Sequence, residues 1–228
     1  MANQYFTTQS MTFLRQLRKN NNRDWFHEHK AEYEALIRSP ALKFIEDMAD
    51  DLARISPHFM AHSKKVGGSL MRVHRDVRFG KDKRPYKTNI GIQFRHEQGK
   101  DVHAPGFYVH IEPDECFLGV GIWRPDAAAL GKIRDAIIER DQYWLAAIKD
   151  KRFKNKYELT GDALKNAPRG YPKEHALIED LKRKDFIAIT PIEEASIISS
   201  RFRKMVVDRY IAADAYMQFL CQALMLRY

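Results

Sequence analysis

GFYVHIEPDECFLGVGIW, residues 106–123, decides the fold, because apolar side chains alternate with others on both sides of the short break at residues 113–115. Alternation with a period of two is typical of a half-buried β-strand, and a break of three residues is short enough for a hairpin. The same alternation occurs in SLMRVHR (69–75) and TNIGIQFRHE (88–97). The sequence therefore predicts a central antiparallel sheet of four or more strands within residues 69–123.

Helical patterns lie on both sides of this predicted sheet. Residues 1–60 repeat apolar side chains at helical spacing, and Asp126 and Asp141 stand where helices would begin. Further on, the sequence predicts loop or a short strand in 151–172, a helix at 174–183, a short strand FIAIT at 186–190, and one or two helices over 197–226. Residues 126–228 are thus mostly helical. Because no repeat or linker divides the chain, we predict a single α+β domain over residues 1–228, with a helical N-terminal part, the sheet at 69–123 and C-terminal helices.

Composition excludes several classes of protein. Hydrophobic residues make up 44% of the 228, enough to bury a core. No run of about 18 apolar residues exists, and the first ten residues do not resemble a signal peptide, so we expect a cytoplasmic protein without membrane association. Cys116 and Cys221 match no metal or redox spacing and are expected as buried thiols. The sequence predicts no metal and no cofactor, and it leaves the oligomeric state open.

Positive charge is concentrated in two segments. The whole chain carries a formal charge of +9, whereas residues 64–87 alone hold nine basic and two acidic side chains. Residues 149–156, KDKRFKNK, hold five basic side chains and one acidic side chain. A local excess of this kind indicates an anionic partner, either a small anionic ligand or a nucleic acid.

The alternation divides the predicted sheet into two faces. One is apolar and forms a core face, with Ile90, Ile92, Phe94, Phe107, Val109, Ile111, Cys116, Leu118, Val120 and Ile122. The other combines polar and aromatic side chains with two glycines: Arg72, His74, Gln93, Arg95, Tyr108, His110, Glu112, Phe117, Gly119, Gly121 and Trp123. Glycine inside a strand costs stability unless something approaches closely, so this second face is either a ligand groove or the place where a helix crosses the sheet.

His110 and Glu112 are the candidate catalytic residues. They stand two positions apart on one strand, so their side chains point the same way and can act as an acid and base pair, or the carboxylate can orient the imidazole. Arg72 or His74 opposite them would hold a phosphoryl or carboxyl group. The alternative is a structural or surface histidine.

The candidate anion site lies in RVHRDVRFGKDKRPYKT, residues 72–88, which we predict to begin as a strand and continue as a loop from about Asp76. Arginine suits the two-pronged recognition of phosphate or carboxylate, and lysine acts as a point charge. Asp76 would fix one guanidinium in place. The candidate ligand-binding residues are Arg72, Arg75, Asp76, Arg78, Lys83, Tyr86 and Lys87. The alternative is a salt-bridge network that pins the loop to helices through Asp24, Glu28 or Glu32.

The same segment carries a resemblance. Arg72, Arg75, Asp76, Arg78, Phe79, Asp82, Lys83 and Tyr86 match the signature Arg-x-x-Arg-Asp-x-Arg-Phe followed by Asp/Asn-Lys-x-x-Tyr. In this respect the chain resembles the bacterial family called domain of unknown function 2461. NNNRDWF (20–26) and PGFYVHIEP (105–113) also look like that family, so the resemblance covers most of the chain. It implies no activity, because the family has none assigned.

Three functions are consistent with these patterns. The first is binding, with or without turnover, of a small phosphorylated or carboxylated ligand at the arginine-rich loop, so whether the protein is an enzyme stays open. The second is sequence-independent binding of nucleic acid, with Phe79, Tyr86, Phe153 and Tyr157 stacking on bases. The third is a structural or interaction module in which the Arg/Asp motif only stabilises the fold.

Overall fold

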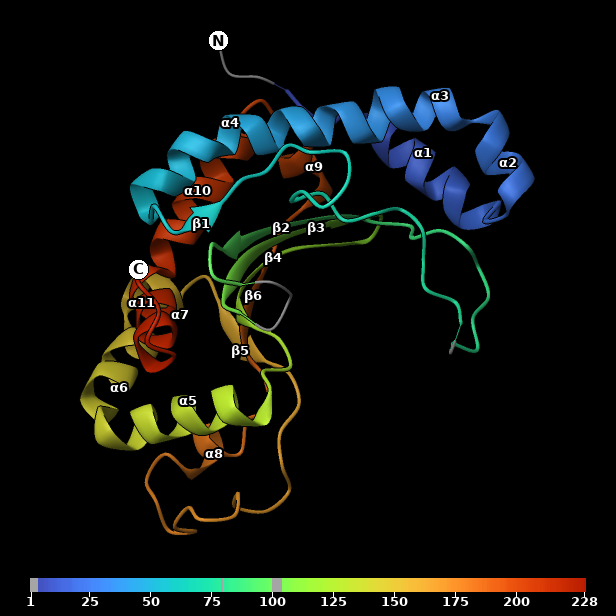
Figure 1. Ribbon diagram of the computed structural model, residues 1–228. Helices are drawn as coiled ribbons and strands as arrows, with labels where there is room; N and C mark the ends of the chain where they lie inside the picture. Colours follow the sequence, from blue (N-terminus) through green and yellow to red (C-terminus); the bar gives the residue numbers. More distant parts are fainter. Residues whose placement is uncertain (1–3, 79, 100–103) are drawn as a thin grey trace.

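The chain folds around one antiparallel sheet, and the computed structural model describes residues 4–78, 80–99 and 104–228 (Figure 1). Six strands pair in the order β1-β2-β3-β4-β6-β5, and every pair is antiparallel. Helices precede and follow the strands of this sheet along the chain. The α+β class and the prediction of an antiparallel sheet of at least four strands are therefore confirmed, although only β2, β3 and β4 lie within the predicted range 69–123.

The elements have the following bounds. The strands are β1 (Phe59–Met60), β2 (Ile90–His96), β3 (Gly106–Glu112), β4 (Glu115–Ile122), β5 (Glu158–Thr160) and β6 (Phe186–Pro191). The helices before the sheet are α1 (Thr8–Lys19), α2 (Arg23–Glu28), α3 (Lys30–Tyr33), a π-helical turn η1 (Glu34–Arg38) and α4 (Ser39–Ile55). Between β4 and β5 lie α5 (Ala127–Glu139), α6 (Asp141–Lys149) and α7 (Lys151–Lys154), and α8 (Ile178–Leu181) lies between β5 and β6. After β6 come α9 (Glu194–Ile197), α10 (Phe202–Ala212) and α11 (Asp214–Ala223).

Strands β3 and β4 form the predicted hairpin, with Val109 opposite Leu118 and Tyr108 opposite Gly119. Asp114 in the turn adopts a φ of 72°, a left-handed conformation that aspartate tolerates better than most residues. The ten residues of the predicted core face are all buried. Helices α4, α10 and α11 pack against this face (Figure 1), and the Tyr210 hydroxyl of α10 donates to the Tyr108 carbonyl at 3.1 Å. The apolar side of the hairpin therefore decides which face of the sheet the helices cover.

The predicted strand at 69–75 is wrong. Residues 69–71 do pair with β2, since the Met71 amide donates to the Gly91 carbonyl at 2.9 Å. The backbone then changes partner, because the Lys87 amide donates to the Val73 carbonyl and the Arg75 amide to the Pro85 carbonyl. Only isolated bridges result, and the His74 bridge is to Tyr86. His74 therefore does not lie opposite His110, as the sequence predicted.

We call residues 72–87 the arm, of which all but Phe79 are described. The arm projects beyond the sheet beneath α2 and α3 (Figure 1). Its base is fixed to the N-terminal helices through Asn21, whose side-chain amide donates to the Tyr86 carbonyl and whose side-chain oxygen accepts from the Tyr86 amide, both at 3.0 Å. The Tyr86 ring stacks on Phe26 with ring centroids 4.0 Å apart.

The C-terminal predictions are partly correct. Asp126 caps α5 by accepting from the Ala129 amide at 2.7 Å, and α6 begins at Asp141 as predicted. FIAIT forms most of β6. The helix predicted at 174–183 is only the four residues of α8. Just before α8, the Leu177 amide donates to His175 Nδ1 at 3.1 Å.

Candidate functional site

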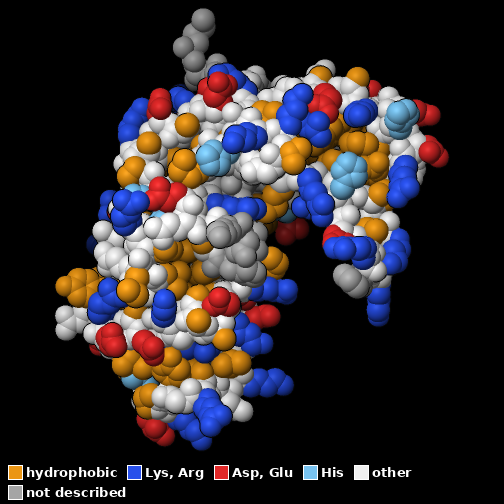
Figure 2. All heavy atoms as spheres, in the orientation of Figure 1, with side chains coloured by type: hydrophobic (Ala, Val, Ile, Leu, Met, Phe, Trp, Pro, Cys, Tyr) orange, Lys and Arg blue, Asp and Glu red, His pale blue; other side chains and the backbone are white. Residues whose placement is uncertain are grey.

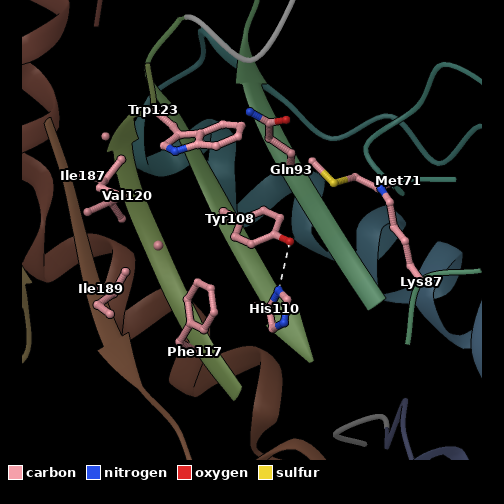
Figure 3. Close-up of a pocket in the computed structure, with 12 residues that line it drawn as sticks. Met71, Lys87, Gln93, Tyr108, His110, Phe117, Val120, Trp123, Ile187 and Ile189 are labelled. Carbon is pink, nitrogen blue, oxygen red and sulfur yellow. Dashed lines mark hydrogen bonds between the residues drawn. The ribbon is translucent and has the colours of Figure 1, made fainter. Parts of the chain in front are cut away.

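The face of the sheet opposite the helices carries a pocket of about 470 Å³ (Figure 3). Pairing places Gln93 beside Tyr108, Tyr108 beside Gly119, and Gly119 beside Ile189, in one row across four strands. Gly119 leaves a gap in that row between two large side chains. The pocket is lined by Met71, Lys87, Gln93, Tyr108, His110, Phe117, Gly119, Val120, Gly121, Trp123, Ile187 and Ile189.

Glycine stands at positions 119 and 121 of β4 for two different physical reasons. Gly121 has a φ of +111°, and a Cβ atom there would lie 2.0 Å from the Phe186 carbonyl oxygen, so only glycine fits. At Gly119 a Cβ atom would meet Tyr108 at an ordinary 3.6 Å. Gly121 is thus explained by the backbone, whereas Gly119 keeps the pocket floor low, as the sequence-based groove hypothesis requires.

Tyr108, His110 and Glu112 form a line of polar contacts along β3. The Tyr108 hydroxyl lies 3.1 Å from His110 Nδ1 (Figure 3), and His110 Nε2 lies 3.4 Å from the Glu112 carboxylate. The Thr88 hydroxyl donates to the other Glu112 oxygen at 2.5 Å, and Asn89 Nδ2 lies 3.4 Å from His110 Nδ1. A carboxylate only accepts and an amide NH₂ only donates, so a neutral imidazole with its proton on Nε2 satisfies every contact.

Burial sets the protonation states in this line. Desolvation lowers the pKa of His110 below 6.5, and the opposing charge of Glu112 only partly compensates. Burial, together with the charge of Glu112, raises the pKa of Tyr108 to about 12. His110 is stacked on Phe117, with ring planes 9° apart. Both nitrogens of His110 are engaged within the protein, so a ligand in the pocket would meet the Tyr108 hydroxyl rather than a free imidazole nitrogen.

Lys87 brings a positive charge to the rim of the pocket. Its side chain is half-buried, and burial first, then the charge of Arg72, lowers its pKa. Neither the Lys87 ammonium nor the exposed Arg72 guanidinium forms a hydrogen bond or an ion pair with the residues that the structure describes. In Figure 3 the Lys87 side chain extends alongside Met71. These two cations therefore remain available to an anion at the pocket edge.

The other arginines of the arm pair with its own aspartates. Arg78 holds the Asp76 carboxylate with two hydrogen bonds, at 2.9 and 2.7 Å. Asp82 accepts from Arg75 at 2.5 Å and from Arg84 at 2.7 Å. The predicted counter-ion role of Asp76 is present, whereas the alternative network reaching Asp24, Glu28 or Glu32 does not appear among the described ion pairs.

Lys83 and Tyr86, two further candidate residues, are used internally. Lys83 donates to the Val77 carbonyl at 2.9 Å. The Tyr86 ring is 6% exposed, which leaves its predicted hydrogen bond to a ligand without a geometric basis. Phe153 and Tyr157 are also buried, so they are not presented for stacking on bases, and Phe79 lies outside the described residues. Figure 2 shows Lys and Arg side chains gathered on the projecting arm around fewer acidic ones.

Several pocket residues were missed by sequence reasoning. Ile187 and Ile189 alternate with buried residues in β6 and so belong to the open face, but only the pairing of β6 with β4 brings them to the pocket. The short β1 falls at the end of the segment 1–60 that was predicted to be helical. Both cysteines are buried free thiols, as predicted. In the described part of the chain, no group of three or more potential ligands is placed to hold a metal ion, and no helix is long and apolar enough to cross a membrane.

Comparison with known proteins identifies a family for the chain but suggests no activity. Neither the curated proteins nor the solved structures give a significant match. A model of a family described as conserved hypothetical protein (DUF2461) matches residues 9–219, which include the arm and all the pocket residues. The extent of this match agrees with the resemblance seen in the arm and its flanking motifs. The chain therefore belongs to the DUF2461 family of conserved hypothetical proteins.

Proposed function

We propose that the protein binds a small ligand with a carboxylate or phosphate group and an apolar body, in the pocket on the open face of the sheet. The observation that carries the proposal is the half-buried Lys87 ammonium, which has no described carboxylate partner and lines an otherwise mainly apolar pocket. A partly desolvated cation is stabilised when an anion joins it, so the pocket favours a ligand that supplies one.

Each part of the pocket has a role in this proposal. Lys87, which lines the pocket, would hold the anionic group, and Arg72, whose charge acts on Lys87 from outside the lining, would assist it. The apolar body would lie over Gly119, between Trp123, which is 48% exposed, and Ile189. The Tyr108 hydroxyl would meet any polar group of the ligand, backed by His110 and Glu112. If the ligand is turned over, the Tyr108–His110–Glu112 line would transfer the proton.

The arm contributes fewer cations to the proposed ligand site than its charge indicates. Arg75, Arg78 and Arg84 are bound by Asp76 and Asp82, and this pairing supports the structural interpretation for that part of the motif. The proposed ligand site thus retains Arg72 and Lys87 from the predicted anion clamp.

A pair of probes tests the proposal. Calorimetry would compare 1-naphthoate with 1-naphthalenemethanol, which has the same ring system without the charge. We expect 1-naphthoate to bind about tenfold more tightly, because only it can pair with Lys87. Lys87→Met should remove most of that difference, and Gly119→Leu should weaken the binding of both probes by filling the pocket.

Lys81→Met is the matched control, because it removes one charge from the same arm outside the pocket lining. Its affinity for 1-naphthoate should stay within about twofold of the unmodified protein. Equal binding of the two probes, or an equal effect of Lys81→Met and Lys87→Met, would contradict the proposal.

A further inference from the structure

A second basic hollow lies away from the sheet face, along α10. It has a volume of about 380 Å³ and is lined by Lys156, Arg201, Lys204, Met205, Asp208 and Arg209. Arg201, the N-cap residue of α10, and the four positions within the helix follow the spacing i, i+3, i+4, i+7 and i+8, so they form one stripe. Lys156 comes from the second basic segment, just after α7. We call this hollow the α10 groove.

Positive charge in the α10 groove is largely unopposed. Its one acidic residue, Asp208, is already bound by Lys204 at 2.6 Å. Lys156, Arg201 and Arg209 have no carboxylate partner among the described residues. Arg201 is the N-cap residue of α10, which begins without a side-chain cap and without an acidic residue in its first turn. The partial positive charge of the helix N-terminus therefore adds to that of the side chains.

Two buried donors beside the groove lack acceptors. Arg209 Nε and the Tyr157 hydroxyl are both inaccessible to solvent and have no hydrogen-bond partner among the described residues. The Tyr157 ring is 6% exposed. Tyr157 directly follows Lys156, which lines the groove together with Arg209. Burial raises the pKa of Tyr157, and the charge of Arg209 acts in the opposite direction. Buried polar groups are nearly always satisfied, so unpaired donors beside a cationic groove indicate a missing acceptor.

We propose that the α10 groove is a second anion-binding site, separate from the sheet pocket, for a compact ligand with at least two phosphate groups. Five of the six lining residues are charged and four of these are cationic, so the groove favours a ligand with more than one negative charge. Arg201 and Arg209 are about 12 Å apart along the helix axis, which one phosphate cannot bridge without drawing both side chains inward. Arg209 and Lys156 would bind one phosphate, and Arg201 and the helix N-terminus the other.

Calorimetric titration with inorganic pyrophosphate tests this site. We expect one-site binding that Lys156→Gln/Arg209→Gln weakens about tenfold or more, because both removed charges touch the ligand. Lys149→Gln/Lys151→Gln removes two charges from the same basic segment outside the groove and should change the affinity less than about twofold. The titrations are carried out in a Lys87→Met background, so that pyrophosphate held by the sheet pocket does not contribute to the measured binding.

Thermal unfolding without ligand checks that each variant is folded. If the Lys156/Arg209 variant is not, Arg201→Gln/Lys204→Gln replaces it, since both side chains are exposed. The proposal is overturned if the unmodified protein does not bind pyrophosphate, or if the segment control loses as much affinity as the groove variant. It is also overturned if an oligonucleotide binds more tightly and displaces pyrophosphate, because the groove would then serve a nucleic acid.

Discussion

Two glycines of one strand, Gly119 and Gly121, should respond differently to the same added methyl group. Gly121→Ala should destabilise the fold by about 2 kcal/mol or more, because the residue has a positive φ and its Cβ would overlap the Phe186 carbonyl. Gly119→Ala should cost less than about 1 kcal/mol, since its Cβ meets only ordinary contacts. Urea unfolding of the two variants gives the comparison. Similar losses at both positions would show that Gly119 is also fixed by the backbone.

His110 gives a prediction about pH. Because its folded-state pKa lies below 6.5, the unfolded state binds the proton more tightly between these two values. The contribution of His110 to stability is therefore lost as pH falls below 6.5, and the loss levels off below the folded pKa. An NMR titration of the imidazole measures that pKa directly.

The matched variant for His110 is Glu112→Gln. Removing the carboxylate removes the contact that raises the His110 pKa, so the pKa should fall further below that of the unmodified protein. If it rises or stays the same, Glu112 does not interact with the imidazole, and the Tyr108–His110–Glu112 line is not a functional unit.

Among the elements, the strands with continuous alternation were predictable and the arm was not. Strands β2, β3 and β4 alternate over seven or eight residues each, and their pairing is local along the chain. SLMRVHR also alternates, but it pairs with β2 for only three residues before 85–87 becomes its partner. Periodicity describes burial and cannot say which neighbour supplies the hydrogen bonds, so the strand prediction was wrong there. The same limit concealed the contribution of β6 to the pocket.

The arm depends on its two aspartates unequally. Asp82 joins Arg75 to Arg84 across the arm, whereas Asp76 binds Arg78, two residues away. Asp82→Asn should therefore speed hydrogen exchange of the Arg75 and Lys87 amides, which hold the arm together, by about threefold or more. Asp76→Asn should have a smaller effect. Equal acceleration in the two variants would mean that neither ion pair organises the arm.

The same ion pairs should respond to acid. The Arg78 contact lowers the pKa of Asp76 from 3.8 to about 2, and Arg84 and then Arg75 lower that of Asp82. A depressed carboxyl pKa gives a contribution that is present above the unfolded value and is lost as pH falls through the folded value. The arm pairs should accordingly persist at pH 4.

At the scale of the whole molecule, the two basic segments face different surroundings. The arm lies on one side of the sheet, and α7 lies on the other, behind α11 (Figure 1). A polyanion following both segments would have to pass around the sheet, and the aromatic side chains predicted to stack along the way are buried, apart from Phe79, which is not described. The charge of the chain therefore divides into separate sites, each with a few unpaired cations.

The salt dependence of nucleic-acid binding tests whether the two basic segments act separately. The arm offers four cations without a carboxylate partner in the described chain: Arg72, Lys81, Lys83 and Lys87. Single-stranded nucleic acid held by the arm alone should give a slope of log K against log salt concentration of about −3, whereas both segments together would give about −6. Fluorescence anisotropy with a labelled oligothymidylate of about 20 nucleotides measures the slope.

Two charge-matched variants decide which segment carries any such binding. Lys81→Gln/Lys83→Gln removes two cations from the arm and should make the slope shallower by about 1.4 units. Lys149→Gln/Lys151→Gln removes the same charge from the second segment and should leave the slope unchanged, because no strand held by the arm reaches it. A slope near −6 that both variants reduce would show that the two segments act as one nucleic-acid surface. Nucleic-acid binding would then be favoured over small-ligand binding as the function.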